Sequence, residues 1–122
     1  MPQQPNLIAL PTHLGLQFYE KSQVLLFRNK CDEGFDKPCW EAMLTNHETI
    51  RLSNQLTAEK IIKSLSNPSF FQINQSCILN LDFLSEITYK TRQCKLISSN
   101  ELFNLTISRS QLIKLREIYE IK

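Results

Sequence analysis

Short apolar runs separated by polar turn residues dominate this chain of 122 residues. Leu16–Glu20 alternates apolar and polar side chains, as a half-buried strand does, and Val24–Phe27 is a continuous apolar run typical of a buried strand. Lys21-Ser22 between them predicts a tight reversal. Further strand signals follow at residues 40–44, 49–52, 70–73, 77–80, 84–89, 94–97 and 102–107. The pattern predicts a mainly β fold of about nine or ten strands joined by short turns.

Two segments carry helix signals instead. Thr57 can cap a helix that Pro68 stops, and aliphatic residues at helical spacing give it a buried face: Ile61, Ile62 and Leu65. A second helix is expected over residues 110–120, with Ser110 as its N-cap, because apolar residues recur there at spacings of three and four: Leu112, Leu115, Ile118 and Tyr119. The sequence therefore predicts one or two short helices.

The first twelve residues differ from the rest because prolines stand at positions 2, 5 and 11. Such spacing indicates an extended leader or the remnant of a linker over residues 1–12, in which the short apolar run of residues 6–10 can add an edge strand. We expect residues 13–122 to form a single domain, since a chain of this length supports one core but not two.

Composition narrows the class of protein. Apolar residues make up 42% and charged residues 21%, which fits a soluble globular domain. The net charge is only +2, so any nucleic-acid face must come from the local placement of cations. No apolar run approaches the ~18 residues of a membrane span, and no signal peptide is evident. These features predict a cytoplasmic protein without a membrane partner.

An enzyme, a cofactor site and a metal site are not expected. Both glycines are isolated, so there is no phosphate-binding loop, and neither histidine stands in a ligand or triad motif. The four cysteines fit no zinc spacing. We expect Cys77 and Cys94 to be small core residues, and Cys31 and Cys39 to border a charged loop. A redox pair of Cys31 with Cys39 is the competing reading.

One polar turn carries the clearest functional chemistry. Residues 74–76 stand between two apolar runs, and Ser108-Arg109 opens the expected C-terminal helix. Asn and Gln amides can bond a base edge bidentately, and an Arg guanidinium can bind guanine or a phosphate. The alternative for the turn is an ordinary solvated reversal, and for Arg109 a surface ion pair with Glu86 or Glu117.

The same stretches resemble the LytTR family of DNA-binding domains, from about residue 15 to residue 119. The matching positions of its signature are Phe71, Ser76, Asn80, Ser108 and Arg109. Gln72, Asn74 and Gln75 stand where that family often has Arg, His, and Arg or Asn. The resemblance implies an elongated stack of antiparallel sheets that inserts loops into successive major grooves of DNA. The chain resembles the output domain of a response regulator, without a receiver domain.

The resemblance also implies which residues touch DNA: Lys37, Gln72, Asn74, Gln75, Ser76, Arg109 and Ser110. Lys37 is placed only by its neighbourhood, because Pro38 occupies the position that best matches the family's contact in the first loop. Asn80 is instead expected to be structural, bonding backbone in the following turn. Amides in place of cations remove phosphate contacts and favour adenine edges, so we expect weaker binding or a shifted sequence preference.

The sequence thus predicts a sequence-specific transcriptional regulator of double-stranded DNA, acting as two copies on spaced repeats, with a partner protein that could supply the signal. Two weakly basic domains gain from simultaneous engagement what each lacks alone. The alternative is a protein-interaction or regulatory module of the same fold, whose DNA affinity is weak or lost with the missing cations.

Overall fold

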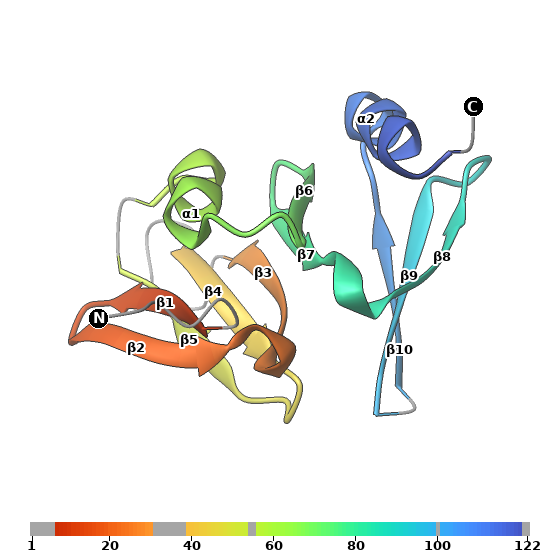
Figure 1. The fold of residues 1–122 in the computed structure, drawn as a ribbon. Coiled ribbons are helices and arrows are strands. Elements are labelled where there is room, and N and C mark those ends of the chain that lie inside the picture. The colour runs from red at the N-terminus through yellow and green to blue at the C-terminus, as the bar shows by residue number, and fades with distance from the viewer. Residues whose placement is uncertain (1–6, 31–38, 54–55, 100, 121–122) are drawn as a thin grey trace.

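The computed structural model describes residues 7–30, 39–53, 56–99 and 101–120. These residues form ten strands in three antiparallel sheets, two α-helices and two short 3-10 helices. The sheets follow one another across the molecule in Figure 1, with β1 and β2 at one end and β8 to β10 at the other. The predicted mainly β fold, with its stack of antiparallel sheets, is confirmed.

The central sheet has five strands in the order β5-β4-β3-β7-β6. Their bounds are β3 (Val24–Lys30), β4 (Cys39–Leu44), β5 (Thr49–Arg51), β6 (Phe70–Asn74) and β7 (Cys77–Asn80). Val24 to Phe27 in β3 are all buried, because both faces of this sheet are covered. The continuous apolar run of β3 therefore reflects its place in the middle of the molecule.

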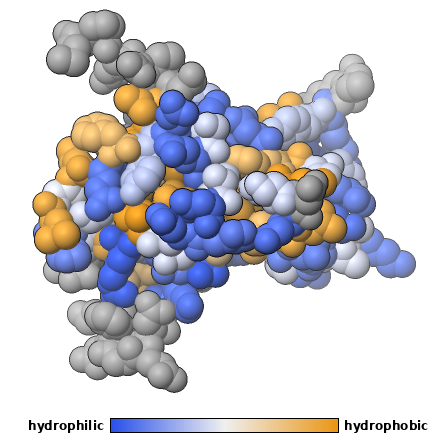
Figure 2. All heavy atoms as spheres, turned by 90° about the horizontal axis from the view of Figure 1, so that it is seen from below, coloured by the Kyte–Doolittle hydropathy of each residue, from blue (hydrophilic) through white to orange (hydrophobic). Residues whose placement is uncertain are grey.

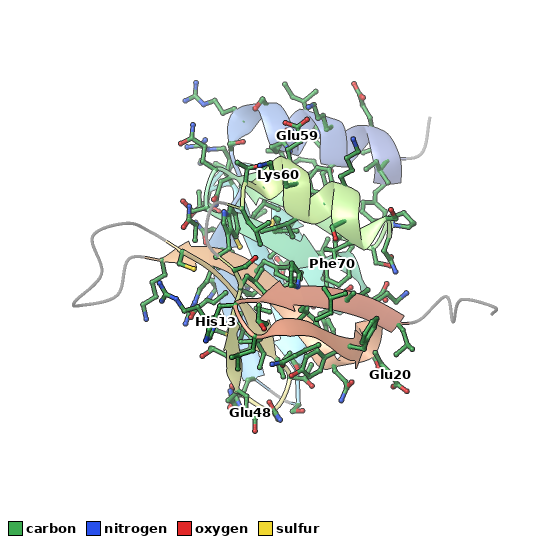
Figure 3. All side chains as sticks on the ribbon, turned by 90° about the vertical axis from the view of Figure 1, so that its left-hand side faces the viewer. His13, Glu20, Glu48, Glu59, Lys60 and Phe70 are labelled. Carbon is green, nitrogen blue, oxygen red and sulfur yellow. The ribbon has the colours of Figure 1, made fainter. Side chains whose placement is uncertain are left out.

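The first face of the central sheet is covered by the hairpin of β1 (Leu7–Thr12) and β2 (Gly15–Glu20), together with helix α1 (Ala58–Leu65). Ile8 and Leu10 of β1 and Ile61 of α1 pack into one apolar cluster with β3, β4 and Phe70. Phe70, labelled in Figure 3, meets Phe27 edge to face, with ring centroids 5.6 Å apart. The predicted strands over 16–20 and 24–27 are present.

The second face is covered by β8 (Leu84–Thr88), β9 (Gln93–Ser98), β10 (Glu101–Thr106) and helix α2 (Arg109–Tyr119). Their apolar side chains form a second cluster with the other face of the central sheet, and its fully buried members include Leu79, Leu96, Ile107 and Leu115. The first cluster and the second thus share one sheet, and each face of that sheet has its own helix.

The reversal predicted at Lys21-Ser22 is wrong. A 3-10 helix, η1 (Lys21–Gln23), joins β2 to β3, and the two strands belong to different sheets. β2 pairs with β1, and its side chains Leu16 and Phe18 are 61% and 64% exposed on the outer face of the hairpin. Apolar side chains are visible among hydrophilic ones at the end of the molecule that carries this hairpin in Figure 2. Local alternation identified the strand but could not specify its partner.

The helix starts were predicted with different success. Thr57 caps α1 by accepting a hydrogen bond from the Lys60 amide, and the helix ends at Leu65, with Ser66 as its C-cap, before Pro68, as predicted. The prediction of Ser110 as N-cap of the second helix is wrong, because Ser108 takes that position and accepts from the Gln111 amide. Ser108 and Gln111 have the Ser-x-x-Gln spacing that often marks a helix start, so the signal was present.

Asn80 is structural, as predicted, and fully buried. Its Nδ2 donates to the carbonyls of Lys21 and Val24, at 3.0 and 2.9 Å, and its Oδ1 accepts from the Asp82 amide at 3.0 Å. A second 3-10 helix, η2 (Leu81–Phe83), starts at this residue. Asn80 therefore joins the end of β7 to the start of β3 with its polar groups satisfied.

Part of the expected leader, residues 7–12, forms β1 and contributes to the core, while residues 1–6 lie outside the described residues. The division of the chain at residue 12 stays a prediction.

Neither described helix is both long and apolar enough to cross a membrane.

Candidate nucleic-acid interface

The polar turn lies at the end of the β6–β7 hairpin. Phe70 pairs with Asn80 and Gln72 with Ile78, and the register then shifts so that Asn74 pairs with Cys77. Gln75 and Ser76 form the turn, and both are exposed. The Asn74 Oδ1 accepts from the Ser76 amide at 2.7 Å, a side-chain bond that stabilises a tight reversal.

Arg109 is the first residue of α2 and is exposed at the start of that helix. Ile107 directly before the cap is fully buried, and its amide donates to the Arg92 carbonyl at 2.9 Å. The buried Ile107 fixes where β10 ends and where the helix begins. The backbone that carries the Arg109 side chain therefore has a defined position, at the helix end where the dipole favours anions.

The structure brings this helix start next to the polar turn. The Asn74 Nδ2 donates to the Thr106 carbonyl at 2.7 Å, and the Ser108 amide donates to the Ile73 carbonyl at 2.8 Å. The turn and Arg109, which are far apart in the sequence, are thus held close to each other. This pairing is the main geometric feature of the candidate site.

The first loop leaves the central sheet beside the same turn. The Asn29 amide donates to the Ser76 carbonyl at 2.9 Å, and Lys30 pairs with Cys39 at the last position of the β3–β4 ladder. The two stems of the loop over residues 31–38 are therefore next to the hairpin turn. Lys37 itself lies outside the described residues, so its predicted contact stays a prediction.

Arg109 makes no ion pair with any described residue. Glu86, one of its two expected partners, lies 3.6 Å from the Lys95 ammonium instead, measured from carboxylate oxygen to Nζ. Arg28, further back on β3, is bonded to the Glu41 carboxylate and is largely neutralised. The charge of Arg109 is thus available for a DNA phosphate or base beside the polar turn.

Two residues of the site were missed from the sequence. Arg92 lies in the turn between β8 and β9, and its carbonyl accepts the Ile107 amide one residue before the cap of α2. Gln111 reaches back from α2, and its Nε2 donates to the Gln72 carbonyl at 2.6 Å. Nothing in the sequence around Arg92 indicated its place beside the helix start, whereas Gln111 is the glutamine of the Ser-x-x-Gln capping pattern that begins at Ser108. Ser110 is exposed on the first turn of α2.

The cysteines are arranged as predicted where they are described. Cys77 and Cys94 are buried in the second cluster, and Cys39 starts β4 and donates its thiol to the Leu52 carbonyl at 3.3 Å. Burial raises the pKa of the Cys77 thiol to about 12, with Cys94 adding to the rise and Arg28 opposing it. Burial likewise raises the pKa of Cys94 to about 11. Cys31 lies outside the described residues.

Comparison with known proteins gives a family for this arrangement. A family model of the LytTr DNA-binding domain matches residues 42–120. The fold is similar to a solved LytTr DNA-binding domain of a response regulator from Bacillus cereus, with a TM-score of 0.65 and 19% sequence identity. That match covers 95% of this chain and 98% of the other. No curated protein matches this chain.

Proposed function

Because this chain belongs to the family of LytTr DNA-binding domains, we propose that it is a sequence-specific transcriptional regulator that inserts loops into successive major grooves of double-stranded DNA. It acts in the cytoplasm, without catalysis. The observation that carries the proposal is the junction of the turn at residues 75–76 with Arg109, made by the bond from Asn74 to Thr106.

Each element at this junction has a chemical role that suits DNA. Arg109 binds guanine or a phosphate, and Gln75 offers an amide to a base edge from the apex of the turn. Arg92, whose main-chain carbonyl is bonded to the Ile107 amide, adds a phosphate contact that supports orientation but not sequence preference. Lys37, Ser76 and Ser110 complete the proposed surface through the first loop, the turn and the helix start.

The modest charge makes binding by two copies the favoured arrangement. A net charge of +2 gives a weak overall field, so a single domain has little non-specific affinity. Two domains on spaced repeats engage the same duplex, and the second contact benefits from the high effective concentration set by the first. A partner protein that supplies the signal would alter how often both copies are bound.

The test is an anisotropy titration with duplexes selected from a random pool, at low and moderate salt. Arg109→Ala should weaken binding by ~1–3 kcal/mol, the range for a bidentate base contact, without loss of folding. Lys114→Ala is the matched control, since it removes an exposed cation from the same helix away from the junction. Equal losses in the two variants would show that Arg109 acts only through general charge.

A second function is favoured by one observation, the apolar outer face of the β1–β2 hairpin. Leu16 and Phe18 stand there on the same side of β2, and Leu14, in the turn between β1 and β2, is 81% exposed. Exposed apolar patches of this kind often mark protein interfaces. If the selected duplexes bind no more tightly than random DNA, a protein-interaction module becomes the better description.

A further inference from the structure

Three successive residues of β6 are bonded to the segment that runs from the last residue of β10, Thr106, into the first turn of α2. The Gln72 carbonyl accepts from the Gln111 Nε2 at 2.6 Å, and the Ile73 carbonyl accepts from the Ser108 amide at 2.8 Å. The Asn74 Nδ2 completes the row by donating to the Thr106 carbonyl at 2.7 Å. We call these three bonds the β6–α2 clamp. The clamp fixes the distance and angle between the hairpin turn and Arg109.

The clamp and the turn together engage the groups that Asn74 would need to read a base. Its Oδ1 accepts from the Ser76 amide at 2.7 Å while its Nδ2 donates to Thr106. Bidentate recognition of adenine requires the oxygen and the nitrogen of one amide to face the base edge together. Both ends of the Asn74 amide are therefore held by the protein, and turning the amide toward a base edge would strain or break the bonds that hold the turn in place.

Gln72 is engaged in a similar way. Its Nε2 donates to the main-chain carbonyl of Asn74 at 3.0 Å, and its own main-chain carbonyl belongs to the clamp. The side chain therefore lies along the hairpin and supports the backbone of the residue that precedes the turn. Two of the three amides at the positions where the family often has cations thus make contacts within the protein.

Gln75 is different although it is the next residue. It is exposed at the apex of the turn, and its side chain makes no hydrogen bond with any described residue. Both groups of its amide are available for a base edge, and the clamp holds the backbone that carries it. A long side chain on a fixed turn loses less conformational freedom on binding than one on a mobile loop.

We propose that Asn74 is a positioning residue, which acts with Gln111 through the clamp, and that base reading by the hairpin turn falls to Gln75. This inference rests on the proposed DNA-binding function. It divides the two neighbours by role: Gln75 sets which bases are preferred, and Asn74 sets how Gln75 and Arg109 are placed together. Adenine is the base that the free amide of Gln75 recognises best.

The test compares binding-site selections for the wild type and two variants, Gln75→Ala and Asn74→Ala. Gln75→Ala should lose the base preference at the positions it contacts and weaken binding to the wild-type site by roughly 5- to 100-fold. Asn74→Ala should weaken binding and leave the preferred sequence unchanged. If the wild type selects no sequence at all, the proposed function fails; a changed consensus in Asn74→Ala overturns the division of roles alone.

A double-mutant cycle with Arg109→Ala gives a second readout that a merely structural role would not move. Asn74 and Arg109 should be strongly coupled, because an Arg109 that is absent cannot be misplaced. Gln75 and Arg109 should contribute independently, so their fold-changes multiply. Coupling for Gln75 together with multiplication for Asn74 would overturn the proposal.

Gln111→Ala keeps the test valid if Asn74→Ala fails to fold. It breaks the same clamp from the helix side and leaves intact the turn's own bond, which the Ser76 amide donates to the Asn74 Oδ1. We expect weaker DNA binding, an unchanged consensus and coupling to Arg109. Binding by Gln111→Ala that equals the wild type would show that the clamp does not position the site.

Discussion

The two helices cover opposite faces of one sheet, and they are held there in different ways. The described hydrogen bonds of α1 are confined to the helix and its caps, and Ile61 is its single buried side chain. α2 buries Leu112 and Leu115 and is bonded to β6 through its start. At its other end, the Arg116 guanidinium lies 4.2 Å from the centre of the Tyr89 ring. α1 serves as a cover, whereas α2 joins three parts of the fold.

The largest expected effect on stability comes from shortening a buried side chain of α2. Leu115→Ala should destabilise the protein by ~2–5 kcal/mol, because Leu115 is fully buried and its removal leaves a cavity in the second cluster. Ile61→Ala is the matched change in α1. Urea denaturation measures both, and a larger loss for Ile61→Ala would contradict the comparison.

Asn80 supports both faces, so its loss should not distinguish them. Asn80→Ala removes the three hydrogen bonds that this fully buried side chain makes with the backbone of Lys21, Val24 and Asp82. We expect a loss of about 1–3 kcal/mol of folding free energy in a single cooperative transition. Fluorescence of Trp40, in the first cluster, and accessibility of Cys94, in the second, to a thiol reagent should report the same midpoint. Separate midpoints would show that one face unfolds without the other.

The two helices also differ in how far the sequence could predict them. Every signal for α1 is local: Thr57 caps it and Pro68 stops it, so the prediction was right. The start of α2 depends on where Ile107 becomes buried and where β10 ends, and two serines compete for the cap. Burial of Ile107 against the second cluster is a tertiary effect, which the local pattern of Ser110 and the following aliphatic residues did not reveal.

The candidate site divides in the same manner. The turn at residues 74–76 and Arg109 could be identified from residue type and order, and the structure brings them together. The bonds from β6 to the start of α2 could not be predicted, since Thr106, which accepts from Asn74, and Gln111, which donates to the main-chain carbonyl of Gln72, are distant in the sequence. The partner of β2 was missed for a related reason, because alternation identifies a strand without specifying its sheet.

Removal of the two helix caps should separate the roles of the helices. Thr57→Ala and Ser108→Ala should each cost about 1 kcal/mol of folding free energy, the usual value for a lost N-cap. Only Ser108→Ala should also weaken DNA binding, because its helix carries Arg109 into the junction. Thermal melts and anisotropy titrations on both variants give the comparison. Equal DNA affinities in the two variants would place the helix start outside the site.

The smallest effect is expected for the thiols, which occur in the second cluster but not in the first. Cys77 and Cys94 have pKa values of about 12 and 11, raised from 9.0 by burial. Below pH 9.0 both stay protonated in the folded and the unfolded chain, so they do not change stability with pH. Between pH 9.0 and these values only the unfolded chain loses the protons, so stability should fall as the pH rises.

At neutral pH the same burial should protect both thiols from reagents. N-ethylmaleimide should leave the peptides that contain Cys77 and Cys94 unmodified in the native protein and label them in denaturant, as read by mass spectrometry. A reductant should change neither the melting temperature nor the DNA affinity, and purified protein should contain no stoichiometric zinc. The Leu115→Ala variant is the positive control, because a loosened second cluster exposes the thiols more often. Rapid native labelling of either cysteine, or a reductant-dependent affinity that Cys39→Ser abolishes, would instead make a thiol part of a regulatory element.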